Sequence, residues 1–166
     1  MKHTIIIAGI VLASLFTSCQ EDYLDAPAQS SLDESVIFSS LTLAQGAIDG
    51  IKIPFAETNS YRGRFIPFYG LNTDTEWNNS STSAGDTSDL QNYGVTTTNT
   101  QMNSTNNAWA QMYAGIERAN ICIRGLRLYG NPKPGTDLGY LLGEAITLRA
   151  IYYADLVKAW GDVPYR

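Results

Sequence analysis

A long polar stretch holds the side chains of this sequence that are best suited to bind a ligand. From residue 72 to residue 107, 29 of 36 positions are Asn, Ser, Thr, Asp, Gln or Gly, and none is Lys or Arg. Carboxylates and planar amides can bridge pairs of sugar hydroxyls, and an aromatic ring can stack on the C–H face of a sugar. The stretch therefore predicts a sugar-binding loop. Its candidate ligand-binding residues are Asp74, Glu76, Trp77, Asn78 and Tyr93.

Two other interpretations of this stretch stay open. Compact domains rarely contain loops longer than ~12–15 residues unless the loop is functional or disordered. Disorder is therefore one alternative. The other is that its larger apolar side chains anchor the loop to a helical core. These side chains are Trp77, Leu90, Tyr93, Val95 and Met102.

Hydrolysis of a glycan by Asp74 and Glu76 is a further alternative. Two carboxylates at positions i and i+2 of a strand would lie ~7 Å apart, from a rise of ~3.3 Å per residue. Glycosidase carboxyl groups stand ~5–5.5 Å or ~6.5–9.5 Å apart, so the spacing alone does not exclude it. Catalytic pairs, however, usually flank a cleft from separate elements. We therefore expect binding without catalysis, and no enzyme.

Charge and histidine content exclude several other classes of function. The sequence has 16 acidic and 11 basic residues, which argues against nucleic acid as a partner. Its single histidine, His3, lies in an amino-terminal segment with the pattern of a cleaved signal. A chain without histidine has no Ser-His-Asp triad, no Cys-His pair and no His-ligated metal. We expect neither a metal site nor a cofactor, and the aspartates of the polar stretch match no calcium-loop spacing.

The amino terminus predicts export and a lipid anchor. Lys2 precedes an apolar run from Ile5 to Phe16, which is too short for a membrane span of ~20 residues. The run ends in Leu15-Phe16-Thr17-Ser18-Cys19, which resembles a bacterial lipobox, although Phe16 stands where leucine is usual. That resemblance implies that Cys19 is acylated. The alternative is an incidental cysteine beside an ordinary secretion site.

These features divide the chain into three segments. We expect a lipoprotein signal peptide at residues 1–18, a lipid-anchored linker at 19–38 and a helical domain from residue 39 to residue 166. In the linker, Glu21 and Asp22 resemble the signal that exports lipoproteins to the outer face of the outer membrane in Bacteroidetes. In the helical domain, Cys122 lies between Ile121 and Ile123, which predicts a buried core residue instead of a nucleophile.

Apolar side chains at helical spacing predict the elements that would position the loop. One helix covers residues 41–52, and Pro54 is expected to end it. Two longer helices cover residues 108–130 and 137–160, and Gly161 is expected to cap the second. They would form an αα-hairpin whose first apolar positions follow tetratricopeptide spacing. The predicted fold class is mainly all-α, a tetratricopeptide-like scaffold with a long polar loop region.

Arg149 interrupts the apolar face of the last helix. A buried guanidinium needs a partner, because an unpaired buried charge is strongly destabilising. We expect that partner to be a carboxylate on another element, since Glu144 is poorly placed on the same helix.

Several motifs, in this order, resemble the amino-terminal portion of SusD-like (RagB/SusD) outer-membrane lipoproteins of Bacteroidetes. The first two are "SCQEDYLDAPAQS", with Leu24 and Pro27, and "FSSLTLAQGAIDGI". They are followed by "WAQMYAGIERANICI" and "LLGEAITLRAIYYADLVKAWGDVPYR". The resemblance covers essentially the whole chain. Because that family is longer, it also predicts that the helical domain is truncated and incomplete at Arg166.

The resemblance implies a role at the cell surface. Such proteins are lipid-anchored in the outer membrane, are exposed on the cell, and bind glycans or other nutrients. They deliver the ligand to a SusC-like TonB-dependent transporter and do not cleave it. The alternative function is a membrane-tethered helical-repeat adaptor that binds no small ligand.

Overall fold

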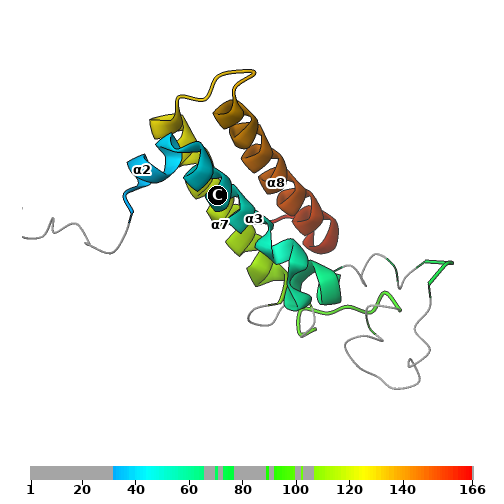
Figure 1. Cartoon of the computed structure of the whole chain (residues 1–166). Coiled ribbons are helices and arrows are strands. Elements are labelled where there is room, and N and C mark those ends of the chain that lie inside the picture. The colour runs from blue at the N-terminus through cyan, green and yellow to red at the C-terminus, as the bar shows by residue number, and fades with distance from the viewer. Residues whose placement is uncertain are drawn as a thin grey trace, which may run out of the picture. The chain divides into compact units, whose positions relative to one another are not determined.

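The computed structural model describes residues 32–65, 70, 73–76, 89, 92–99, 102 and 107–165. The chain divides between Leu32 and Asp33, and the helices among the described residues lie after that point. No strand occurs among the described residues, so the predicted all-α fold class is confirmed. The helical elements are α2 (Glu34–Ser39), α3 (Leu41–Ala56), η2 (Thr58–Phe65), α7 (Ala108–Gly125), η3 (Leu126–Gly130) and α8 (Asp137–Trp160) (Figure 1). The two η elements are π-helical turns.

Helix α2 begins at an aspartate cap. The backbone N–H of Ser35 donates to Asp33 Oδ1 at 2.7 Å, which satisfies one of the free donors of the first turn. Phe38 near its end is only 2% exposed, and Arg124 of α7 forms an ion pair with Glu34 at 2.6 Å. Helix α2 therefore packs on the helical domain, ahead of the boundary expected at residue 39.

The expectation that Pro54 ends the first helix is wrong, because α3 continues to Ala56. A proline inside a helix leaves the carbonyl four residues earlier without its N–H donor. Here that carbonyl belongs to Gly50, and it accepts a hydrogen bond from Arg118 Nη1 of α7 at 3.1 Å. A side chain from a neighbouring helix thus replaces the bond that Pro54 cannot make.

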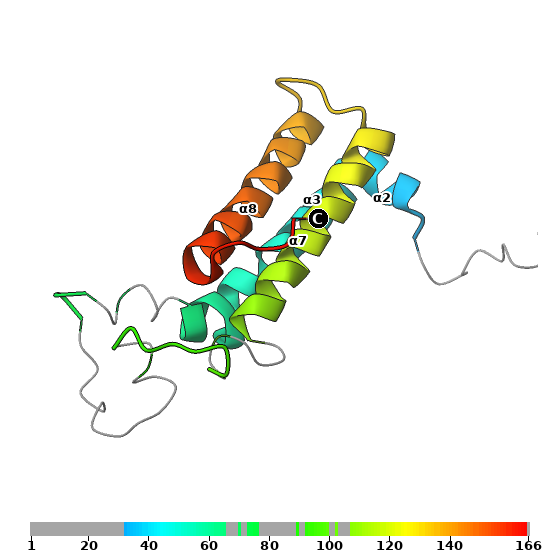
Figure 2. The same cartoon turned by 180° about the vertical axis from the view of Figure 1, so that it is seen from behind.

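Helices α7 and α8 form the predicted αα-hairpin. They lie side by side in both views, and α3 packs against each of them (Figures 1 and 2). Thr136 caps α8 by accepting from the N–H of Gly139 at 3.2 Å. At the other end, Gly161 adopts a φ of 76° and donates its N–H to Val157 O, which confirms the predicted cap. The Tyr113 hydroxyl then donates to Pro164 O at 2.8 Å and holds the carboxyl-terminal turn against α7.

The core lies where α3, α7 and α8 meet. Its side chains recur every three or four residues along each helix, so that they lie on one apolar face, as the sequence predicts. The buried residues of these helices include Ala44, Ile48 and Ile51 from α3, Met112, Ile116, Ala119, Cys122 and Ile123 from α7, and Leu141, Ala145, Tyr152 and Leu156 from α8.

Aromatic rings fill the end of the core near η2. The ring of Tyr152 stacks on Phe55 at a centroid distance of 4.7 Å and meets Tyr61 edge-on at 6.0 Å. Trp109 of α7 meets Trp160 of α8 edge-on at 5.3 Å, so the hairpin is also closed by aromatic contact. Trp109, Tyr152 and Trp160 therefore serve packing.

Arg149 has a different partner from the one expected. It is half-buried, and its Nη1 donates to the side-chain amide oxygen of Asn120 on α7 at 2.8 Å. The expectation of a carboxylate partner for Arg149 is therefore wrong: the partner in the described part of the chain is an amide. A partly exposed guanidinium keeps part of its hydration, and a neutral amide then suffices. Glu144, on the same helix, pairs instead with Lys52.

A methyl group at Gly115 should destabilise the hairpin. A Cβ built there would lie 2.5 Å from ring carbons of the buried Tyr152, closer than packed atoms can approach. Overpacking a tight core costs about 1–3 kcal/mol. We therefore expect Gly115→Ala to lower the free energy of unfolding by that amount, measured by urea denaturation.

Gly143→Ala is the matched control on α8. A Cβ at Gly143 meets nothing within 4 Å, so only helix propensity changes. Alanine should stabilise the helix there by roughly 0.5–1 kcal/mol. Equal effects of the two substitutions would contradict the close approach of α7 to α8 at Gly115.

Candidate ligand-binding site

Asp74 and Glu76 lie in a short turn held by hydroxyl groups. Both the N–H and the hydroxyl of Thr73 donate to Gly70 O, at 3.2 Å and 2.8 Å. The Thr73 hydroxyl also lies 2.9 Å from that of Thr75. Asp and Thr residues favour such turns because their side chains bond to nearby backbone. Residues 73–76 are all exposed to solvent.

Both carboxylates of this turn are exposed. The Glu76 carboxylate lies against Gly70, where it occupies the space that any side chain at that position would need. Gly70 therefore lets the carboxylate fold back over the turn. Asp74 and Glu76 belong to one exposed turn and do not face each other across a cleft. This arrangement suits hydrogen bonding to a ligand better than acid–base catalysis by the pair.

Tyr93 lies in a second turn of the polar stretch. The N–H of Gly94 donates to Asp89 O at 2.9 Å and closes this turn. Tyr93 has a φ of 58°, a conformation uncommon for a residue with a side chain, and its side chain is 77% exposed. The Tyr93 ring is thus largely exposed to solvent. Tyr93 is therefore not a buried anchor of the loop.

The predicted anchors divide into two groups. Met102 is 2% exposed and belongs to the hydrophobic core, so its anchoring role is confirmed. Val95, in contrast, is 37% exposed. Asn99, at 1% exposure, is also buried, although nothing in the polar composition of this stretch distinguishes it from its neighbours.

Several predicted positions lie outside the described residues. They include the signal peptide at residues 1–18, the lipidation site Cys19, the export-signal residues Glu21 and Asp22, the candidate ligand residues Trp77 and Asn78, and Leu90. Of the five candidate ligand residues, the structure thus describes Asp74 and Glu76 in one turn and Tyr93 in another.

Cys122 is a buried thiol on α7. It is 3% exposed, and burial raises the pKa of this thiol to about 11. The thiolate is the reactive form, so at neutral pH the native protein holds Cys122 as an inert thiol. The prediction that Cys122 is a core residue is confirmed.

We expect Cys122 to resist a thiol reagent at pH 8 until the protein unfolds. Once unfolded, its pKa returns to about 8.5 and the thiolate becomes abundant. Because the folded pKa is the higher one, rising pH favours the unfolded chain from about pH 8.5 upward. The measurement is absorbance after addition of a disulfide reagent, with and without urea, in the Cys19→Ala variant. Rapid labelling without urea would contradict the burial of Cys122.

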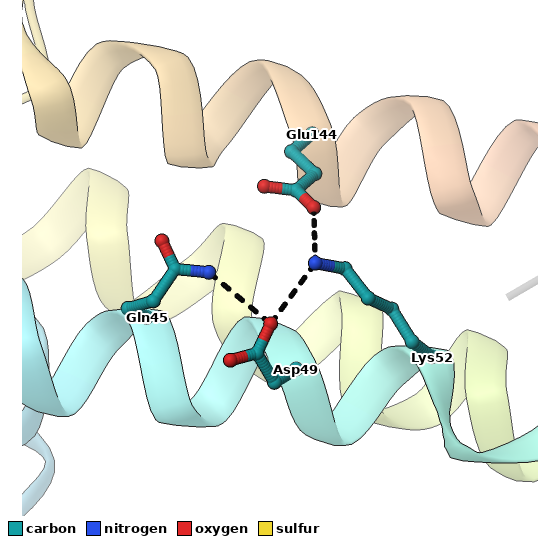
Figure 3. A network of polar contacts seen from close by, with 4 residues as sticks. All are labelled: Gln45, Asp49, Lys52 and Glu144. Carbon is teal, nitrogen blue, oxygen red and sulfur yellow. Dashed lines mark hydrogen bonds and ion pairs between the residues drawn. The ribbon is translucent and has the colours of Figure 1, made fainter.

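A polar network joins α3 to α8 on the outside of the bundle (Figure 3). Lys52 Nζ lies 2.9 Å from Asp49 Oδ1 and 2.6 Å from Glu144 Oε1. Gln45 Nε2 donates to the same oxygen of Asp49 at 3.2 Å. The Glu144 carboxylate, and after it Asp49, raises the pKa of Lys52, while Lys52 and then Gln45 lower that of Asp49.

Sequence reasoning missed this network as a possible functional feature. Gln45, Asp49 and Lys52 follow one another at four- and three-residue spacing, which places them on one side of α3. That signal was available in the sequence. The fourth member, Glu144, is 92 positions away from Lys52 in the chain, so only the packing of α8 on α3 reveals it.

The described residues contain no group of three or more side chains suited to hold a metal ion. Among the helices of the described part, none has the length and apolar character needed to cross a membrane.

Comparison with known proteins identifies relatives along nearly the whole chain. Residues 22–166 match a SusD-like family described as "Starch-binding associating with outer membrane". SusD-like protein P38 of Formosa agariphila is 30% identical over 166 residues, which cover 95% of this chain and 29% of that relative. The chain thus spans less than a third of the length of P38. No solved structure matches it significantly. The family match extends from the end of the expected signal through all the helices, and the chain therefore belongs to the SusD-like family.

Proposed function

We propose that this protein is a lipid-anchored outer-membrane protein that binds glycans or other nutrients at the cell surface and delivers them to a SusC-like TonB-dependent transporter. The observation that carries the proposal is the family match over residues 22–166, whose description joins starch binding to the outer membrane. The helical scaffold supports it, because η2 and α7, which flank the polar stretch in the sequence, pack against each other.

Attachment through Cys19 is the proposed link to the membrane. The family match begins three residues after Cys19, so the charged and apolar residues 1–18 precede it, as a removed signal would. Cleavage before Cys19 would make this residue the first of the mature chain. Glu21 and Asp22 would then direct export to the outer surface.

Glycan binding is proposed for the loop that contains Asp74, Glu76, Trp77, Asn78 and Tyr93. The exposed ring of Tyr93 and the exposed carboxylates of Asp74 and Glu76 support the proposal, because stacking and bridging hydrogen bonds are what a sugar offers to a protein surface. We propose that the ligand is released unchanged, since the two carboxylates share one open turn.

Replacing Trp77 with Ala should weaken glycan binding. Loss of a sizeable apolar contact corresponds to roughly 1–3 kcal/mol of binding free energy. The melting temperature should stay the same if Trp77 contacts ligand and does not anchor the loop. Titration calorimetry with maltoheptaose, a neutral starch fragment, measures the affinity, and thermal unfolding measures the stability.

Trp109→Ala is the matched control, because the Trp109 ring packs on Tyr113 at 5.0 Å and on Trp160. It should lower the melting temperature. If Trp77→Ala behaves in the same way and keeps its affinity, Trp77 is an anchor. Co-purification with a transporter barrel without saturable binding of maltoheptaose would favour the tethered adaptor instead.

A further inference from the structure

A groove opens between the first turns of α3 and α8, apart from the loop proposed to bind glycans. Its volume is about 530 Å³, within the range of roughly 300–1,000 Å³ that is usual for small-ligand sites. Helix α3 contributes Leu41, Thr42 and Gln45, and α8 contributes Asp137, Tyr140 and Glu144. We infer that this groove binds a neutral sugar residue and discriminates against anionic ones.

The groove presents an aromatic ring with an apolar floor. Tyr140 is 67% exposed and Leu41 43% exposed, while Leu141 beneath them is 5% exposed. On α8, the positions 137, 140, 141 and 144 share one side of the helix, so the ring stands beside the carboxylates. Gln45 and Glu144 form the polar wall of the groove. A sugar placed here would set its C–H face against Tyr140 and its hydroxyls toward this polar wall.

The polar wall is held in place by the network of Figure 3. Gln45 gives its amide N–H to Asp49, and Glu144 gives one oxygen to Lys52. Figure 3 shows the amide oxygen of Gln45 and the second oxygen of Glu144 directed into the space between α3 and α8, on the same side of Lys52. Both oxygens are hydrogen-bond acceptors, and sugar hydroxyls are donors. Each of the two side chains already has a bonded partner, so part of the freedom that a ligand would remove is lost before it binds.

The charge of the groove selects among sugars. Asp137 and Glu144 line it, and no Lys or Arg does so in the part of the chain that the structure describes. The nearby Lys52 is already shared by Asp49 and Glu144. Lys133 lines a neighbouring hollow that shares Leu41 and Asp137 with the groove, and it does not line the groove itself. An incoming carboxylate or sulfate would therefore meet like charge with no cation lining the groove to compensate it. Neutral sugars avoid that repulsion.

The inference rests on the proposed function only in presuming that the protein meets glycans. The test is a titration of the isotope-labelled protein with maltoheptaose, followed by the backbone amide resonances of Thr42 and Tyr140. These resonances should shift saturably, and Tyr140→Ala should weaken this binding by about tenfold, the effect of losing one good ring contact. Tyr165→Ala, which removes another exposed tyrosine, outside the groove, should leave it unchanged.

An oligogalacturonate of similar length supplies the anionic probe. It should shift the same resonances weakly or not at all. Asp137→Asn should reduce the difference in affinity between maltoheptaose and the oligogalacturonate. Equal affinity for both probes in the unchanged protein would overturn the claimed selectivity.

Three further results separate the possible failures. If maltoheptaose binds but Tyr140→Ala has no effect on it, the groove is not a sugar site, and the proposed function stands. If maltoheptaose and the anionic probe both fail to bind anywhere, the inference and the glycan ligand of the proposed function fall together. If trilysine saturates the groove and maltoheptaose does not, the groove serves a basic peptide and the inference is wrong.

Discussion

Replacing Cys19 with Ala should abolish lipid attachment completely. The proposed acyl acceptor is the Cys19 thiol, and alanine offers no atom that could replace it. The other cysteine of the chain, Cys122, is buried in the helical core. A single chain of ~14 carbons already gives measurable membrane affinity, and several chains anchor a protein firmly. Cells fed with radiolabelled palmitate should therefore label the unchanged protein and leave the variant unlabelled, as an uncleaved or soluble periplasmic form.

Cys122→Ala is the matched control, since it removes the other thiol and keeps the proposed anchor. It should keep both the label and the membrane fraction. Palmitate label on a Cys19→Ala protein that is still recovered with membranes would show that the anchor lies elsewhere.

Tyr152→Ala should cause the largest loss of stability among single substitutions in the core. The ring is fully buried, stacks on Phe55 and contacts Tyr61, and its hydroxyl donates to Ile51 O of α3 at 2.6 Å. Burial raises the pKa of this hydroxyl and keeps it protonated as a donor. Removing a buried aromatic side chain costs about 3–5 kcal/mol. Since whole domains are stable by only ~5–15 kcal/mol, urea denaturation should show a large shift of the midpoint.

Tyr152→Phe separates the hydroxyl from the ring. It keeps the aromatic contacts and removes the hydrogen bond to Ile51 O, so we expect a loss of about 1–3 kcal/mol. A loss below about 1 kcal/mol for Tyr152→Ala would contradict the placement of this ring at the junction of α3, α7 and α8.

The hairpin was predictable because its signals are local. Apolar residues at helical spacing define α7 and α8, and Gly161 ends α8 by a conformation that glycine adopts easily. The burial of Cys122 followed from its two isoleucine neighbours. For these elements, the local preferences and the tertiary packing agree.

The errors occur where a distant residue supplies a bond. Helix α3 passes through Pro54 because Arg118 replaces the missing donor, and Arg149 finds Asn120 on another helix. Neither partner can be selected from sequence spacing, because each lies far along the chain and many other polar side chains are candidates. Packing alone brings Glu144 to Lys52.

The candidate site was predictable in residue types more than in arrangement. Polar composition selected Asp74 and Glu76, and the structure adds the hydroxyl-bonded turn that exposes them. Tyr93 was open to two interpretations, and its exposure argues against a buried anchor. Trp77 and Asn78 lie outside the described residues, so their part in the site stays a prediction.

Binding of fluorescent maltoheptaose to intact cells that produce the protein tests glycan capture at the cell surface most directly. We predict saturable labelling of the cells, recovery of the probe at its original length, and loss of the labelling in cells that produce the Cys19→Ala variant. No labelling above that of cells without the protein, or recovery of a shortened probe, would contradict the account.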